Sequence, residues 1–131
     1  MKIVFDTNVL ISSLWGDSIS NKLLIRLLER KDELFTSIEI LNEFKRVLKR
    51  DFKYNEIMTE ETIIKLLDIF RLIKPCEKID VIKEDPADNK ILECAASSKS
   101  DFILSYDNHL LKLIEFKGIK IMTPAEFIKK F

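Results

Sequence analysis

The chain has 131 residues, the size of one ordinary domain, and we expect residues 1–131 to form a single domain. Hydrophobic residues make up 47% and charged residues 34% of the chain, with only 2 Gly and 3 Pro, which excludes a disordered or low-complexity protein. The 22 Lys and Arg balance 22 Asp and Glu, so no global positive charge indicates nucleic-acid binding, and any site for a polyanion must be local.

The first predicted element is a short strand that passes directly into a helix. Residues 3–5 form a β-branched and aromatic run, and the apolar residues over 9–15 recur at helical spacing. The sequence DTN at residues 6–8 lies between them. Asp6 is therefore expected at the carboxyl end of a buried strand.

Two further helices and a strand are predicted next. The stretch 17–30 places apolar residues on one helical face: Ile19, Leu23, Leu24, Leu27 and Leu28. ELFTS at 33–37 is a second strand, and Ser37 opens a helix whose core face is Ile40, Leu41, Phe44, Val47 and Leu48. Another helix is expected to begin at Thr59 and to end at Ile73, before Pro75.

The second half of the chain alternates in the same way. KPCEKI at 74–79 is a weak strand candidate, and DPADNKILECAASSK at 85–99 is a helix. Strands at 101–105 and 119–123 flank a short helical turn, and a last helix begins with Pro124. This alternation favours an α/β fold, a three-layer α/β/α sandwich with a central parallel sheet.

Four acidic residues are expected to meet at one edge of this sheet. Asp6 and Asp107 each follow a strand, Asp88 begins a helix at the same edge, and Glu43 flanks the apolar stripe of the helix opened by Ser37. Each acid alone has a simpler explanation, as a helix cap or, for Glu43, an ion pair on its own helix. Clustered carboxylates repel one another unless a cation neutralises them, and Mg²⁺ or Mn²⁺ prefers oxygen ligands. Together the acids predict a metal site.

Four sequences, FDTNVLISSL, EILNEFKRVL, DPADNKILECA and ILSYDNHLL, resemble in order and spacing those of PIN-domain ribonucleases. The resemblance is strongest to VapC-like toxins of prokaryotic toxin–antitoxin systems and covers essentially the whole chain. It implies a PIN-like, Rossmann-like topology in which the first and fourth strands are neighbours. It also implies that the acidic quartet of the family, with its metal ligands, falls on Asp6, Glu43, Asp88 and Asp107.

Other positions follow from the same resemblance. Asn8 and Ser105 match the accompanying small polar residues, and we expect Asn8 to orient Asp6. Where the family often has Thr and Gly, this chain has Ser105 and Tyr106, so that the turn before Asp107 is bulkier.

The predicted reaction is hydrolysis of RNA phosphodiester bonds with one or two Mg²⁺ or Mn²⁺ ions as cofactor. Asp6 and Asp107 are the safest direct ligands. Arg46, Arg50 and Lys90 are candidate RNA contacts, although each is also explained as a solvated charge. The only histidine, His109, is interpreted as structural.

Two other functions stay open. One is a catalytically idle PIN-like module that binds RNA or protein. The other is an aspartyl-phosphate phosphatase or receiver domain, which also places an Asp at a strand end. It is disfavoured because the phosphatases need an Asp where this chain has Asn8, and no acid pair typical of receivers lies near the first strand.

Surplus apolar residues predict a partner surface. In the helix predicted over 59–73, Ile69 and Leu72 widen an already complete apolar stripe, and Trp15 is of a type favoured at interfaces. We expect a homodimer or the binding of a cognate antitoxin segment in the same groove. The alternative is that the loop 49–60 folds over this surface within the monomer.

Cysteines and hydropathy give little further information about function. Cys76 and Cys94 are too few to indicate a disulfide framework or a zinc site, and Cys94 is interpreted as a buried small hydrophobic residue. No charged leader precedes an apolar stretch of signal-peptide or membrane-spanning length, and we expect a cytoplasmic protein without membrane contact.

Overall fold

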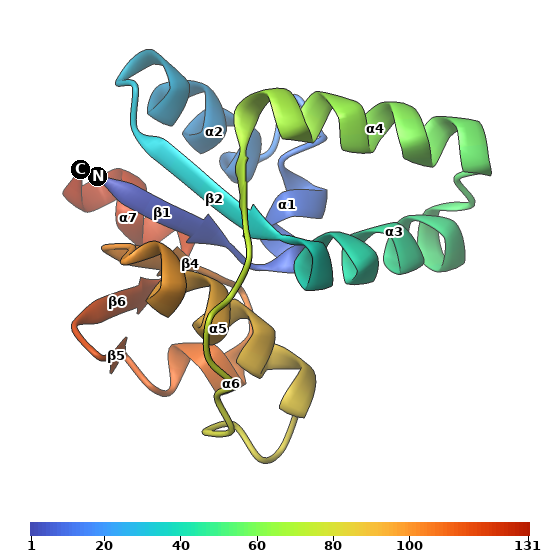
Figure 1. The fold of residues 1–131 in the computed structure, drawn as a ribbon. Helices are drawn as coiled ribbons and strands as arrows, with labels where there is room; N and C mark the ends of the chain where they lie inside the picture. The colour runs from blue at the N-terminus through green and yellow to red at the C-terminus, as the bar shows by residue number, and fades with distance from the viewer.

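A computed structural model describes residues 1–131 and shows a six-stranded sheet with helices on both of its faces (Figure 1). The strands are β1 (Lys2–Phe5), β2 (Glu33–Ser37), β3 (Arg71–Ile73), β4 (Phe102–Leu104), β5 (Glu115–Phe116) and β6 (Ile119–Met122). The α-helices are α1 (Thr7–Ser12), α2 (Ile19–Glu29), α3 (Ile38–Phe52), α4 (Glu56–Ile69), α5 (Asn89–Ser98), α6 (Asn108–Leu111) and α7 (Pro124–Lys130), and η1 (Pro86–Asp88) is a short 3₁₀ helix.

The strand order is β3-β2-β1-β4-β6-β5, and every pair is parallel except the short hairpin of β5 and β6. The prediction that the first strand neighbours the strand at 101–105 is confirmed, because Val4 of β1 pairs with Ile103 of β4. From β1 the chain first builds the sheet toward β3 and then crosses back to β4. The order therefore reverses between β1 and β4, the point at which ligands bind in open α/β sheets.

The helices form the outer two of three layers, which confirms the predicted α/β/α sandwich. In Figure 1, α5 and α6 cover the near face of the sheet, while α2 and α7 lie behind it. Strands β1 and β4 lie between these layers and are apolar apart from Lys2 at the start of β1, with Ile3, Val4, Ile103 and Leu104 fully buried. The carboxyl ends of these strands are thus held by the core of the molecule.

Two helices, α3 and α7, begin at the residues that the capping signals of the sequence predict. The Ser37 hydroxyl accepts a hydrogen bond from the amide of Ile40 at 3.3 Å and starts α3. At α7, Pro124 is the first helical residue, and Thr123 and Glu126 form a reciprocal capping box.

The predicted helix over 59–73 is wrong at both ends. Asn55 caps α4 by accepting a hydrogen bond from the amide of Met58 at 2.8 Å, so the helix begins earlier. Residues 71–73 form the edge strand β3 instead of a last helical turn, because they pair with residues 35–37 of β2. Tertiary pairing here overrides the helical periodicity of the sequence.

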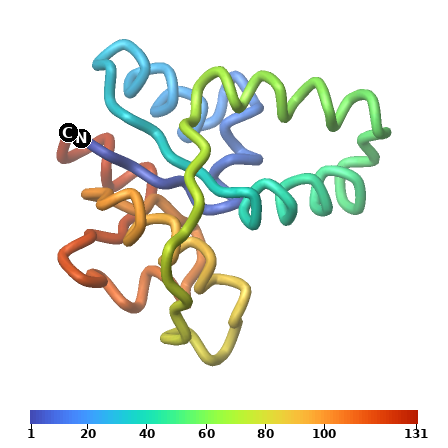
Figure 2. The backbone as a smooth tube through the Cα atoms, viewed as in Figure 1, coloured from blue at the N-terminus to red at the C-terminus, as the bar shows by residue number.

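The strand proposed for residues 74–79 is not formed either. This segment returns from the sheet edge toward α5 (Figure 2), where its amides bind helix side chains instead of a neighbouring strand. The amide of Cys76 donates to Ser97 Oγ at 3.0 Å, and the amide of Ile79 donates to Glu93 Oε2 at 2.9 Å.

Two smaller expectations also need correction. On α2, Ile19 and Leu28 are 48% and 41% exposed, and only Leu23, Leu24 and Leu27 of the predicted apolar face are buried. Strand β5 was not predicted, since its two residues are recognisable only through their pairing with β6. None of the helices combines the length and the apolar character that crossing a membrane requires.

Candidate metal centre

The four predicted acids come from four different elements around the switch point of the sheet. Asp6 directly follows β1, and Asp107 follows β4 by three residues. Asp88 ends η1, just before α5, and Glu43 lies one turn into α3. Asp6 is close enough to Asp107 and Glu43, and Asp88 to Asp6 and Asp107, for their charges to act on one another.

Asp6 is buried, with 4% of its surface exposed, and makes no side-chain capping bond to α1. Its Oδ2 accepts a hydrogen bond from the hydroxyl of Ser105 at 2.5 Å. The same Ser105 oxygen accepts from the amide of Asp107 at 2.9 Å. Ser105 therefore ties the two strand ends together and orients the carboxylate of Asp6.

Asn8 does not have the role expected from the sequence. It is exposed and forms no hydrogen bond with Asp6. The preceding residue, Thr7, is buried and donates from its hydroxyl to Glu43 Oε2 at 2.9 Å. The sequence did not predict this contact between α1 and α3. The only signal for it was the hydroxyl residue, Thr7, directly after Asp6.

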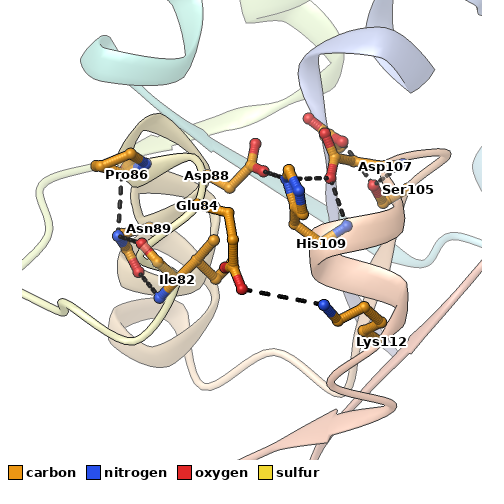
Figure 3. A network of polar contacts seen from close by, with 10 residues as sticks. Ile82, Glu84, Pro86, Asp88, Asn89, Ser105, Asp107, His109 and Lys112 are labelled. Atoms are coloured by element: carbon orange, nitrogen blue, oxygen red, sulfur yellow. Dashed lines mark hydrogen bonds and ion pairs between the residues drawn. The ribbon is translucent and has the colours of Figure 1, made fainter.

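Asp88 and Asp107 face each other with His109 between them (Figure 3). Asp88 is 8% exposed, and its Oδ2 is buried without a hydrogen-bond partner. His109 Nδ1 is also buried without such a partner, at 3.8 Å from Asp88 Oδ2 and 3.5 Å from Asp107 Oδ1. Asp107 Oδ1 additionally accepts from the His109 amide at 2.7 Å.

Asp85 is a further acid of this region that was not singled out from the sequence. One ligand atom each of Asp85, Asp88, Asp107 and His109 lies within 4.8 Å of the others. Asp85 precedes Asp88 by three residues, which is one turn of the 3₁₀ helix η1. The spacing of the two acids in DPAD could therefore have indicated that both lie on the same side of this helix.

Asn89 fixes the loop that carries Asp85. Its side chain is buried, and its Oδ1 accepts from the amides of Val81 and Ile82 at 3.0 and 2.9 Å. Its Nδ2 donates to the carbonyl oxygens of Ile82 and Pro86 at 2.9 and 3.1 Å. These four bonds hold residues 81–86 against the start of α5.

Burial and mutual repulsion disfavour the ionised form of the central acids. Burial raises the pKa of Asp6 to about 6, and the charges of Asp107 and Glu43 add to the effect, against the hydrogen bond from Ser105. Burial likewise raises the pKa of Asp88 to about 8, together with the charges of Asp107, Asp6 and Asp85.

No lysine or arginine forms an ion pair with Asp6, Glu43, Asp88 or Asp107. The helical pair of Glu43 with Arg46, the simpler explanation of Glu43, is not formed. Three carboxylates with a buried, unpartnered oxygen among them suit a hard divalent cation. The residues present thus fit a metal ion.

The predicted RNA contacts differ in their availability. Arg50 binds the carboxylate of Asp51 through two hydrogen bonds of 2.8 and 3.0 Å. Arg46 is exposed and Lys90 half-buried, and neither forms an ion pair. Cys94, by contrast, is fully buried as interpreted from the sequence.

The chain is similar to known proteins both in sequence and in structure. The PIN domain family matches residues 2–109 of the chain. No curated protein matches it. Among solved structures, VapBC-1 from nontypeable Haemophilus influenzae superimposes with a TM-score of 0.67 at 17% identity, covering 95% of this chain and 99% of that one. VapBC2 from Rickettsia felis, bound to a DNA fragment from its promoter, superimposes with a TM-score of 0.65 at 12% identity, covering 92% and 97%.

Proposed function

Because this chain belongs to the PIN-domain family, we propose that it is a divalent-metal-dependent endoribonuclease of the cytoplasm, the toxin of a VapBC-like toxin–antitoxin pair. In this proposal residues 1–131 act as one nuclease domain. The observation that carries it is the meeting of Asp6, Asp88 and Asp107 at the switch point, without a lysine or arginine to neutralise them. The similarity to the VapBC structures supports the fold.

Asp6, Asp88 and Asp107 would hold the metal, with Glu43 as a fourth carboxylate. Mg²⁺ or Mn²⁺, when bound, supplies an activated water and stabilises the charge that develops on the phosphate. Ser105 keeps the carboxylate of Asp6 in one orientation, and Thr7 does the same for Glu43. The protein thereby presents the acids in fixed positions before RNA arrives.

RNA would reach this edge along α3 and the start of α5. Arg46 is one helical turn from Glu43, and Lys90 is two residues after Asp88. Since both are free of ion pairs, they can bind phosphate without losing a partner. Arg50 would first have to leave Asp51.

The decisive variant is Asp6→Asn, which keeps the volume of the side chain and removes its charge. We expect cleavage of RNA to fall at least about 100-fold without loss of the fold. Wild-type cleavage should need Mg²⁺ or Mn²⁺, stop with a chelator, and be blocked by Ca²⁺, whose looser coordination positions the water poorly.

Each alternative predicts a different outcome of this experiment. A protein that binds metal and RNA but leaves the RNA intact is an idle binding module. Cleavage that survives chelation would instead indicate a metal-free nuclease. An alkali-labile phosphate label on Asp6 after incubation with a phosphate donor would indicate an aspartyl phosphate, and hence the phosphatase or receiver class.

A homodimer and an antitoxin complex are part of the same proposal. Trp15 and Phe52 are 40% and 41% exposed, and their rings pack against each other at a tilt of 50° with their centroids 5.0 Å apart. On α4, which extends with α3 beyond the sheet edge (Figure 1), Ile64 and Leu67 are exposed. Residues 49–60 do not form the expected loop, since they end α3 and begin α4. Within this segment Phe52 packs against Trp15, whereas Ile57 is 70% exposed, so the segment covers the apolar surface only in part.

Two residues that the sequence predicts for this surface, Ile69 and Leu72, do not belong to it. Ile69 is half-buried and packs on the core, and Leu72 belongs to the edge strand β3 rather than to the helix. The apolar surface of α4 therefore centres on Ile64 and Leu67.

A further inference from the structure

Among the four residues Asp85, Asp88, Asp107 and His109, the histidine is the one that is not a carboxylate. It follows Asp107 by two residues on α6, and its Nδ1 points at Asp88 and Asp107 (Figure 3). At 3.5 and 3.8 Å these contacts are longer than hydrogen bonds. The buried ring nitrogen therefore has no hydrogen-bond partner within the protein, and a protonated imidazole would make only these two long ion pairs.

The spacing of these atoms is close to that of the ligands of one metal ion. Around a six-coordinate ion with bonds of about 2.1 Å, neighbouring ligand atoms are about 3 Å apart and opposite ones about 4 Å. His109 Nδ1 lies 3.8 Å from Asp88 and 3.5 Å from Asp107, and the four-residue group with Asp85 spans up to 4.8 Å, so small side-chain shifts would bring these atoms around an ion. Independently, the 8% exposed Asp88 directs an unpartnered oxygen into the same space.

We propose that His109 is a direct ligand, through Nδ1, of the metal that Asp88 and Asp107 hold, and that Asp85 joins these residues on the side of the site away from Asp6, so that the ligands include a nitrogen as well as oxygens. This inference rests on the proposed metal dependence but not on RNA being the substrate. The imidazole needs its proton on Nε2, so that Nδ1 offers a lone pair. Asn89 contributes indirectly, since it holds the loop that presents Asp85.

An imidazole ligand changes which metal the site prefers. Mg²⁺ binds oxygen almost exclusively, whereas transition metals accept imidazole readily and increasingly along the series from Mn²⁺ to Co²⁺. The site should therefore select Mn²⁺ or Co²⁺ over Mg²⁺ more strongly than an all-carboxylate site does.

The test uses Mn²⁺ as the probe on the full chain without a histidine tag. Because the chain holds a single histidine, any nitrogen coupling of imidazole type in the electron spin echo modulation of bound Mn²⁺ comes from His109. We expect this coupling in the wild-type protein, and we expect it to change when histidine carries the heavier nitrogen isotope. Its absence from the wild-type protein would overturn the proposal without the need for any variant.

Two variants complete the experiment. His109→Asn offers an amide oxygen near the position of Nδ1, so it should abolish the coupling, weaken Mn²⁺ binding by about tenfold and affect Mg²⁺ binding much less. Asn108→Ala, at the exposed neighbouring position on α6, is the matched control and should change neither. Equal losses of Mn²⁺ and Mg²⁺ affinity in His109→Asn would contradict direct ligation.

Failure of this inference and failure of the proposed function are distinguishable. Nitrogen coupling without RNA cleavage would leave the ligand assignment intact and remove the nuclease proposal. Metal-dependent cleavage without nitrogen coupling would leave the nuclease proposal intact and remove His109 as a metal ligand.

Discussion

At the scale of single residues, Asp6 and Asp88 are buried carboxylates that cap no helix with their side chains. Both positions precede a helix, where an acid is ordinarily explained by capping. Of the three acids at such positions only Asp107 makes that bond, to the amide of His109. Burial of a carboxylate without a lysine or arginine beside it lowers stability, and such a group persists where it serves another purpose.

The raised pKa values predict how the stability of the metal-free protein depends on pH. An acid whose pKa is higher in the folded protein holds its proton more tightly there, so its contribution is present at low pH and lost as pH rises through the folded pKa. For Asp6 this loss runs from about pH 4 to about pH 6 and amounts to about 3 kcal/mol at most, and for Asp88 it continues up to about pH 8.

We expect the melting temperature in a chelator to fall between pH 5 and pH 8, on the order of several degrees. Added Mg²⁺ or Mn²⁺ should reverse this fall and raise the melting temperature more at pH 8 than at pH 5, because bound metal favours ionised ligands. Asp6→Asn should make the fall below about pH 6 less steep, because the contribution of Asp6 is lost between about pH 4 and pH 6. A chelated protein whose stability rises steadily across this range would contradict the assignment.

The hydrogen bond from Thr7 to Glu43 predicts that Thr7 contributes to RNA cleavage indirectly, by orienting the carboxylate of Glu43. Thr7→Val removes the hydroxyl and keeps the shape, so stability should change by about 1 kcal/mol or less. RNA cleavage should fall about tenfold, because Glu43 loses the donor that orients it. Thr7→Ser keeps a hydroxyl and should retain most of the activity. If Val and Ser behave alike in the cleavage assay, the contact has no part in positioning Glu43.

At the scale of elements, the segment between β3 and α5 determines where Asp85 and Asp88 lie. Residues 74–85 have no regular secondary structure, yet Ile79 and Ile82 are buried. Their amides are bound by Glu93 and Asn89 of α5. Together with Ser97, which accepts from the amide of Cys76, three side chains of α5 attach this segment to the helix, which explains these polar residues of α5.

Replacement of Asn89 tests this attachment. Asn89→Ala removes four hydrogen bonds and leaves loop amides without partners, and we expect a loss of about 2–4 kcal/mol in the free energy of unfolding. Affinity for Mn²⁺ should also fall, since the loop carries Asp85. Asn108→Ala, exposed and without side-chain bonds, serves as the control in the same urea titration. Wild-type stability of Asn89→Ala would show that the loop is held by its apolar residues alone.

At the scale of the whole molecule, the chain buries one continuous core and leaves apolar side chains on the α3 and α4 projection. The core comprises 32 buried hydrophobic residues on the two faces of the sheet. Ile64, on the outer side of α4, is 62% exposed, and Leu67 lies one turn further on at 43%. Neighbouring exposed apolar residues of this kind mark surfaces that partners cover.

A double substitution on α4, Ile64→Glu with Leu67→Glu, tests that surface. We expect the wild-type protein to have twice the chain mass of 15.4 kDa in light scattering, and the variant to have the mass of one chain. Thermal stability of the monomer should be retained, since both side chains already face solvent. Lys65→Glu changes the charge of the same helix without removing an apolar contact and should remain dimeric. A monomeric wild-type protein would remove the homodimer and leave the antitoxin as the partner to be tested.

The sequence by itself was enough to predict much of this fold. The strand β1, the helix start at Ser37 and the start of α7 at Pro124 follow from periodicity and capping, which depend on residues within about four positions of each other. The same local signals place Asp6, Asp88 and Asp107 at the ends of strands and the start of a helix. That these acids lie at the same edge of the sheet was expected because the family resemblance implies that β1 and β4 are neighbouring strands.

The tertiary structure alone decided which atoms meet. Ser105 lies 99 positions from Asp6, and Glu43 lies 36 positions from Thr7, so no local signal could pair them. For the same reason residues 71–73 became a strand, since their pairing with β2 is a contact made only after the chain has folded back. His109 was interpreted as structural because its sequence neighbours do not reveal the unpartnered oxygen of Asp88 beside it. Contacts between distant residues depend on the packing of the whole sheet, and only the folded chain sets them.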